Sequence, residues 1–310
     1  MKLFFRLFLL FVCIQINAQN LRSDTVINLK EQVFNSELSF EEKFIFRNNR
    51  RSALLISLAS FYTATLISLD QAWYADYPRS RFHFINDNGE WLQMDKLGHM
   101  ASSYNIGVIG INSFKWAGFN TNQAIWYGGM TGSFFLTIIE ILDGTSKQWG
   151  ASPGDLIANT AGSFLAIGQA LKWGEQRLQL KYSYHHTKWA NINPEQLGNN
   201  DIERMLKDYN GQTYWLTFNV KSISNINIDN FPAWLSLGFG YSGEGMIKPY
   251  NYDSNDLYRQ YFLSLDIDLN KIKTKNKTLN SILNLFGQLK IPAPTLEFSN
   301  RNITFHPIFY

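Results

Sequence analysis

The chain has 310 residues, which is enough for one large or two medium-sized domains with a sizeable core. Charged residues make up 17% of the chain and aromatic residues 15%. Because a soluble domain usually carries about 25% charged residues, this deficit indicates a membrane or burial against a large surface. The net charge is +3, or 3 − 2 = +1 without Lys2 and Arg6 of the leader, which excludes a nucleic-acid-binding protein that depends on a basic field.

Residues 1–18 have the pattern of a secretory signal peptide. Lys2 and Arg6 give it a positive start, residues 7–14 form its apolar middle, and Ala18 offers a small residue for cleavage. The apolar run is too short for an ordinary transmembrane helix. We therefore expect an exported protein.

The single cysteine, Cys13, lies inside this leader. Val12 is bulky where a lipoprotein signal has a small residue, so we expect no lipid on Cys13. The mature chain then has no cysteine, which excludes disulfides, thiolate catalysis and cysteine-ligated metal sites.

Apolar segments rich in small residues fill the next part of the chain. Residues 19–48 are polar and are expected to form a periplasmic lead-in. The spacing of apolar and small residues then predicts four helices, at about 52–69, 92–115, 122–142 and 152–173. Small residues recur every three or four positions in these segments, for example Gly128 and Gly132, and this spacing lets neighbouring helices approach closely. We expect an apolar four-helix bundle within a domain spanning residues 49–175.

The pattern changes to period-two alternation after residue 175. Candidate strands lie at residues 178–184, 213–220, 234–241 and 261–269, with helices at 201–208 and 279–288. The sequence therefore predicts an α+β protein, in which the helices are followed by an antiparallel β-rich region over residues 176–310. We expect this region to associate with or insert into the outer membrane.

Eight polar or ionisable residues interrupt the apolar helices and form the candidate site. They are Asp95, Lys96, His99, Glu140, Asp143, Ser152, Asp155 and Asn159. Charges on apolar helices are costly, so each needs a partner or a role. The helices are joined by short connections and should alternate in direction, which would bring all eight residues to the same end.

Three interpretations of this group remain open. Asp95 and His99 are four residues apart and could share a metal ion with Glu140 and Asp155. His99, Asp95 and Glu140 could instead act as acid–base catalysts. In the third interpretation Lys96 pairs with an acid and only fixes the register of the helices. The sequence identifies no particular metal or cofactor.

Some candidates also have a purely structural explanation. Ser152 suits the N-cap of the fourth helix, with Pro153 in its first position. Asp155 then lies at the third position, where the helix dipole favours an acid. Asn159 suits a hydrogen bond between helices. Lys96, Asp143, Ser152, Asp155 and Asn159 are therefore candidate binding residues, whereas His99, Asp95 and Glu140 are the candidate catalytic residues.

The ordered motifs resemble those of a known family. They are Asp95-Lys96-x-x-His99, then Glu140, then Ser152-x-x-Asp155-x-x-x-Asn159-x-x-Gly162. This order resembles YfiM-like envelope proteins, which are helical and uncharacterised, and is similar to VanZ-like membrane proteins. The likeness covers about residues 91–170 and implies a helical module of the cell envelope. The chain departs from YfiM-like proteins in Val12 before Cys13 and in carrying residues 176–310.

We therefore expect an exported envelope protein of the periplasm or outer membrane. The leading hypothesis is a structural or binding component whose ion-paired site contacts membrane lipid or another envelope protein. The alternative is an envelope hydrolase or transferase that acts on lipid or glycan. A multi-pass inner-membrane location competes, although Arg50 and Arg51 would then oppose the positive-inside tendency.

Overall fold

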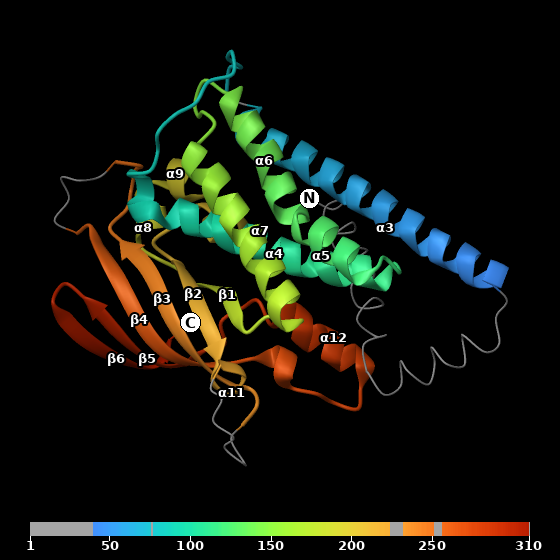
Figure 1. Cartoon of the computed structure of the whole chain (residues 1–310). Coiled ribbons are helices and arrows are strands. Elements are labelled where there is room, and N and C mark those ends of the chain that lie inside the picture. The colour runs from blue at the N-terminus through green and yellow to red at the C-terminus, as the bar shows by residue number, and fades with distance from the viewer. Residues whose placement is uncertain (1–39, 76, 224–231, 251–255, 310) are drawn as a thin grey trace. The chain divides into compact units, whose positions relative to one another are not determined.

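The structure is a computed structural model that describes residues 40–309 apart from 76, 224–231 and 251–255. Helices fill the N-terminal half, and a six-stranded antiparallel sheet follows (Figure 1). This confirms the predicted α+β class. The leader with Cys13 and most of the lead-in 19–48 lie outside the described residues. The apolar four-helix bundle stays a prediction.

The described residues group into two compact units, each built from several chain segments. The first unit holds residues 40–85, 103–172 and 274–282, and the second holds residues 86–102, 173–273 and 283–309, with the gaps given above. The predicted boundary after residue 175 stays a prediction. The division between the units falls inside two of the longer helices. The first turns of the helix that begins at Met94 belong to the second unit, and the helix Lys277–Phe286 is divided after Ile282.

The long helices agree with the predicted positions, with shifted ends. They are α3 (Phe40–Leu69), α4 (Met94–Trp116), α5 (Thr121–Gly129), α6 (Thr131–Gly144) and α7 (Pro153–Trp173), with a π-helical turn at Asp70–Tyr74. The predicted helix 122–142 is broken at Met130 into α5 and α6. Glycines surround this break, and glycine is among the weakest helix formers. The helix α3 begins earlier than the predicted Ser52.

Small residues bring the helices of the first unit into close backbone contact. A Cβ atom added to Gly110 of α4 would lie 2.1 Å from the carbonyl oxygen of Gly128, and one added to Gly132 would lie 2.1 Å from the carbonyl oxygen of Ser103. The hydroxyls of Ser103 and Ser163 lie 2.9 Å apart, which joins α4 to α7. This packing agrees with the role predicted for the small residues at positions 128 and 132.

Among the described residues, two helical stretches are long and apolar enough to cross a membrane, by length and composition. They are Arg47–Leu69 and Thr121–Gly144, with 11% and 44% of their most apolar windows buried. In α3, Leu55, Ile56 and Ile67 are exposed. Core helices of soluble proteins can pass the same test, so it does not establish a location.

The second unit contains the sheet, whose strands pair in chain order. They are β1 (Leu178–Tyr184), β2 (Gln212–Asn219), β3 (Leu235–Glu244), β4 (Tyr258–Ile267), β5 (Ala293–Ser299) and β6 (Asn302–Phe309). The first four match the predicted strands closely, whereas β5 and β6 were not among the predictions. Pro307 lies in β6, which pairs only with β5, so its missing N–H is tolerated at the sheet edge.

Short helices connect or flank the strands. They are α8 (Trp189–Ile192), α9 (Pro194–Leu197), α10 (Asp201–Lys207), α11 (Val220–Ile223) and α12 (Lys277–Phe286), with 3-10 turns at Glu90–Gln93 and Leu269–Lys271. The helices α10 and α12 correspond to the predicted helices 201–208 and 279–288. Along the free edge of β1, the Tyr182 N–H donates to the Gln288 carbonyl, which partly covers that edge.

The inner face of the sheet is buried and largely polar. Lys181 Nζ lies 2.7 Å from Asp266 Oδ2 with both side chains 0% exposed, and Lys290 Nζ lies 3.8 Å from Asp266 Oδ1. The rings of Trp215, Phe262 and Phe309 pack together inside. Because Phe309 belongs to β6 and Trp215 to β2, their contact shows that the sheet is curved, with β6 bent toward β2.

Candidate functional site

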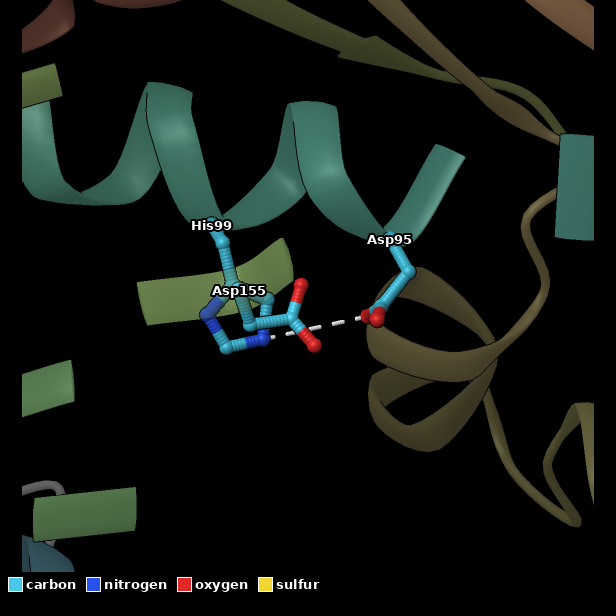
Figure 2. Close-up of side chains that lie close together, drawn as sticks. All are labelled: Asp95, His99 and Asp155. Carbon is cyan, nitrogen blue, oxygen red and sulfur yellow. Dashed lines mark ion pairs between the residues drawn. The ribbon is translucent and has the colours of Figure 1, made fainter. Parts of the chain in front are cut away.

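The motif Asp95-Lys96-x-x-His99 lies on the first turns of α4, within the second unit. Lys96 Nζ lies 2.7 Å from Asp87 Oδ2 and 3.2 Å from Asp95 Oδ2. His99 Nε2 lies 3.8 Å from Asp95 Oδ1, and Figure 2 shows this ion pair between successive turns of the helix. The ammonium group of Lys96 is therefore paired with two carboxylates.

Tyr209 also holds the Asp95 carboxylate. Its hydroxyl donates a hydrogen bond to Asp95 Oδ1 at 2.6 Å. Burial acts to raise the pKa of Asp95, but the neighbouring charges of His99 and Lys96, with the hydrogen bond from Tyr209, lower it below its ordinary value. We therefore expect an ionised carboxylate that faces His99 and has a fixed orientation.

A left-handed turn precedes this motif. Trp91, Leu92 and Gln93 have φ values of 49°, 51° and 66°, a conformation that costs an L-residue about 1–2 kcal/mol. Hydrogen bonds from Tyr241 to the Leu92 carbonyl and from Arg259 to the Gln93 side chain hold the turn. The helix therefore starts at Met94 rather than at the predicted Leu92. Such strain persists only where the surroundings impose it, and it often marks a functional site.

Tyr209→Phe should weaken this network. The lost hydrogen bond to a charged acceptor should cost about 1.5–3 kcal/mol of unfolding free energy at pH 7. Because the folded pKa of Asp95 is lowered, its stabilising contribution is present above the unfolded pKa of about 3.9 and is lost as the pH falls through the folded value. When the pH is lowered, the unfolding free energy of the variant should therefore fall by less than that of the wild type. Urea unfolding at several pH values measures both effects, and an unchanged midpoint at pH 7 would contradict the expectation. Tyr261→Phe, at an exposed tyrosine of β4, is the control.

Glu140, Ser152 and Asp155 meet in the first unit. Glu140 Oε2 accepts a hydrogen bond from the Ser152 N–H at 2.9 Å, and the Ser152 hydroxyl accepts one from the Asp155 N–H at 3.1 Å. The second bond confirms Ser152 as the N-cap of α7 with Asp155 at the third position. Glu140 therefore ties the end of α6 to the start of α7.

Asn159 and Asp143 also have partners in the first unit. The Ser103 hydroxyl donates to the Asn159 carbonyl at 2.5 Å, and the Tyr74 hydroxyl donates to Asp143 Oδ1 at 2.7 Å. Burial, followed by the charges of Asp143 and Glu140, raises the pKa of Tyr74 far above its ordinary value. Asp143 therefore faces a neutral tyrosine that donates a hydrogen bond.

The eight predicted residues thus form two groups. The second unit brings together Asp95, Lys96 and His99, and the first unit brings together Glu140, Ser152 and Asp155, with Asn159 and Asp143 on α7 and α6. The convergence of the two groups at one end of the helices stays a prediction. Asp87 and Tyr209 were not among the predicted site residues, and Tyr209 is 114 residues from Asp95 in the sequence.

Residues 83–169 match a family described as predicted periplasmic lipoproteins of unknown function (DUF2279). The matched segment includes all eight candidate residues but is a minority of the chain. No curated protein and no solved structure matches the chain. The similarity to DUF2279 supports an uncharacterised envelope protein and is consistent with export to the periplasm or outer membrane.

The finer resemblances are not decided by this match. The YfiM-like and VanZ-like likeness stays an expectation, as does the signal peptide. DUF2279 proteins are described as lipoproteins, whereas Val12 argues against a lipid on Cys13. Both residues lie outside the matched segment and outside the described residues, so the absence of lipid also stays a prediction.

Proposed function

We propose that the chain is a periplasmic binding component of the cell envelope whose Asp95–His99 pair holds a divalent metal ion. The observation that carries the proposal is the 3.8 Å between Asp95 Oδ1 and His99 Nε2. This distance is too long for a hydrogen bond. It suits two ligands of one ion, because bonds of about 2.0–2.2 Å place two ligand atoms about 3–4 Å apart.

The groups around Asp95 support this role. Metal-binding carboxylates are usually held by further hydrogen bonds, which fix their orientation. Tyr209 supplies such a bond to Oδ1, and Lys96 lies near Oδ2. The left-handed turn at Trp91–Gln93 fixes the start of α4 just before Asp95. One carboxylate and one imidazole suit a borderline ion such as Zn²⁺.

Elemental analysis and Zn²⁺ titration of the full chain in detergent test the proposal. About one metal ion per chain is expected. His99→Ala and Asp95→Asn should abolish stoichiometric binding, whereas Tyr209→Phe should weaken it about 10–100-fold. His186→Ala is the matched control, because His186 is an exposed histidine of the second unit.

Two outcomes would reject the metal site. Wild-type chain that neither contains metal nor binds added Zn²⁺ would leave the structural and acid–base interpretations. Equal Zn²⁺ affinity in wild type and His99→Ala would show that any bound metal lies elsewhere. A thermal unfolding scan of each variant without metal separates lost binding from lost folding.

A further inference from the structure

The six-stranded sheet has the opposite polarity to that of a soluble protein. Its inward positions are buried and mostly polar, for example Lys181, Thr217, Ser242, Asp266 and Glu297. On the opposite face Gln212 and Arg259 lie near strand ends, and the other positions include these apolar and aromatic residues: Leu178, Leu180, Tyr182, Tyr214, Leu216, Phe218, Leu235, Leu237, Phe239, Tyr241, Tyr261, Leu263, Leu265, Ile267, Leu296, Phe298, Ile303 and Phe305. We call this set the outward face. Soluble sheets that expose one face to water place polar residues there.

The strand register orders the outward face into levels. Tyr182 pairs with Tyr214, Tyr214 with Tyr241, and Tyr241 with Tyr261, so four neighbouring strands carry tyrosine at one level. The next level contains leucine and phenylalanine: Leu180, Leu216, Phe239, Leu263, Leu296 and Phe305. Aromatic residues at one level beside an aliphatic band are typical of strands at a membrane–water boundary.

Polar groups gather beyond the tyrosine level. Arg259 lies on β4 two residues before Tyr261. Its Nε donates a hydrogen bond to the Tyr241 hydroxyl at 3.0 Å. The Tyr241 hydroxyl in turn donates to the Leu92 carbonyl. The rings of Tyr214 and Tyr241 pack against the buried cluster of Leu92, Met94 and Met246, whereas the neighbouring Tyr261 is 52% exposed. Tyr261 is therefore the tyrosine of this level that is placed to lie at a lipid interface.

The length of the band agrees with a lipid partner. On β3, the outward positions run from Leu235 to Tyr241, which is about 20 Å at about 3.4 Å per residue. This is close to the apolar band of about 25 Å on outer-membrane strands.

We propose that the exposed residues of the outward face contact the hydrocarbon of a lipid bilayer, with Tyr261 of the tyrosine level at the headgroups. A protein partner fits less well, because protein interfaces have a polar rim and regular hydrogen bonds, whereas the exposed residues of this face from Leu216 of β2 to Phe305 of β6 are apolar or aromatic apart from Arg259. Figure 1 shows these strands as one continuous sheet. The first unit independently exposes Leu55, Ile56 and Ile67 on α3. This inference does not depend on the proposed metal site.

Single-cysteine probes test lipid contact at the face itself, so that an anchor elsewhere in the chain does not affect the result. Cys13→Ser gives a cysteine-free full chain. Phe239→Cys and Phe305→Cys place an environment-sensitive fluorophore on the outward face, at residues that are 52% and 61% exposed. Ile202→Cys is the matched control, because Ile202 is 61% exposed on α10 of the same unit.

The labelled chains are reconstituted in vesicles of phosphatidylethanolamine and phosphatidylglycerol that contain lipid-attached quenchers. The fluorophores at positions 239 and 305 should shift to the blue and be quenched by groups deep in the acyl chains. A probe at Tyr261→Cys should be quenched more strongly by groups near the headgroups. The control at position 202 should show neither effect.

Two results would overturn the proposal. The first is that lipid-attached quenchers reduce the fluorescence at positions 239 and 305 no more than they reduce it at the control position 202. The other is cysteine cross-linking between two copies at position 305 without lipid quenching, which would identify a second copy as the occupant. Circular dichroism of each labelled chain confirms that the strands are retained.

Discussion

The Asp266→Asn variant is expected to lose about 3–5 kcal/mol of unfolding free energy, because it removes one partner of a buried ion pair. Asp266 lies between Lys181 and Lys290, and none of the three side chains is exposed. Without the carboxylate, two buried ammonium groups would face each other with no compensating charge from position 266. Urea unfolding followed by tryptophan fluorescence measures the loss, because Lys290 Nζ lies 4.9 Å from the Trp215 ring.

Two further variants define this effect. Glu195→Gln removes an exposed acid of the same unit and should change stability by less than about 0.5 kcal/mol. The double variant Lys181→Met with Asp266→Leu replaces the pair by apolar groups and should recover part of the loss. An Asp266→Asn variant as stable as wild type would show that the carboxylate does not hold the interior together.

Gly110→Ala is expected to destabilise the first unit by about 1–3 kcal/mol, because the new methyl group overpacks a backbone contact. Its Cβ would lie 2.1 Å from the Gly128 carbonyl oxygen and 2.4 Å from Thr131 Oγ1. A backbone carbonyl cannot move aside as the end of a flexible side chain can, so α4 and α5 would have to separate. Thermal unfolding of the purified chain measures the change.

Gly168→Ala is the matched control for this substitution. Gly168 lies within α7, and a Cβ added there would have no atom within 4 Å. Alanine should therefore stabilise the chain by about 0.5–1 kcal/mol, because it is the better helix former. The same substitution should thus have opposite signs at the two glycines, and a stabilising Gly110→Ala would contradict the close contact.

Features that depend on neighbouring residues could be predicted from the sequence. Ser152 and Asp155 form the predicted cap because the bond joins residues three apart. The alternation of residues 178–184 predicted β1 at its observed ends. In contrast, β5 was missed because Pro294 lies within it and Pro292 just before it, and proline is unfavourable inside strands.

Contacts between distant segments could not be predicted in the same way. Tyr209 directly follows the predicted helix 201–208, and its bond to Asp95 depends on how the sheet meets the start of α4. Leu92 was assigned to a helix because its apolar character fits one. Its left-handed conformation is imposed by Tyr241, which is 149 residues away. Tertiary contacts therefore decided the structure around Asp95.

The division of α4 between two units has a consequence for biosynthesis. Residues 86–102 leave the ribosome well before the strands that surround them in the second unit, and synthesis adds about 5–20 residues per second. Trp91, Leu92 and Met94 therefore spend several seconds without their apolar partners around Met246 and Tyr241. A chain that ended at residue 175 would carry Asp95 and His99 without Tyr209, so the site would be assembled only when the C-terminal part arrives.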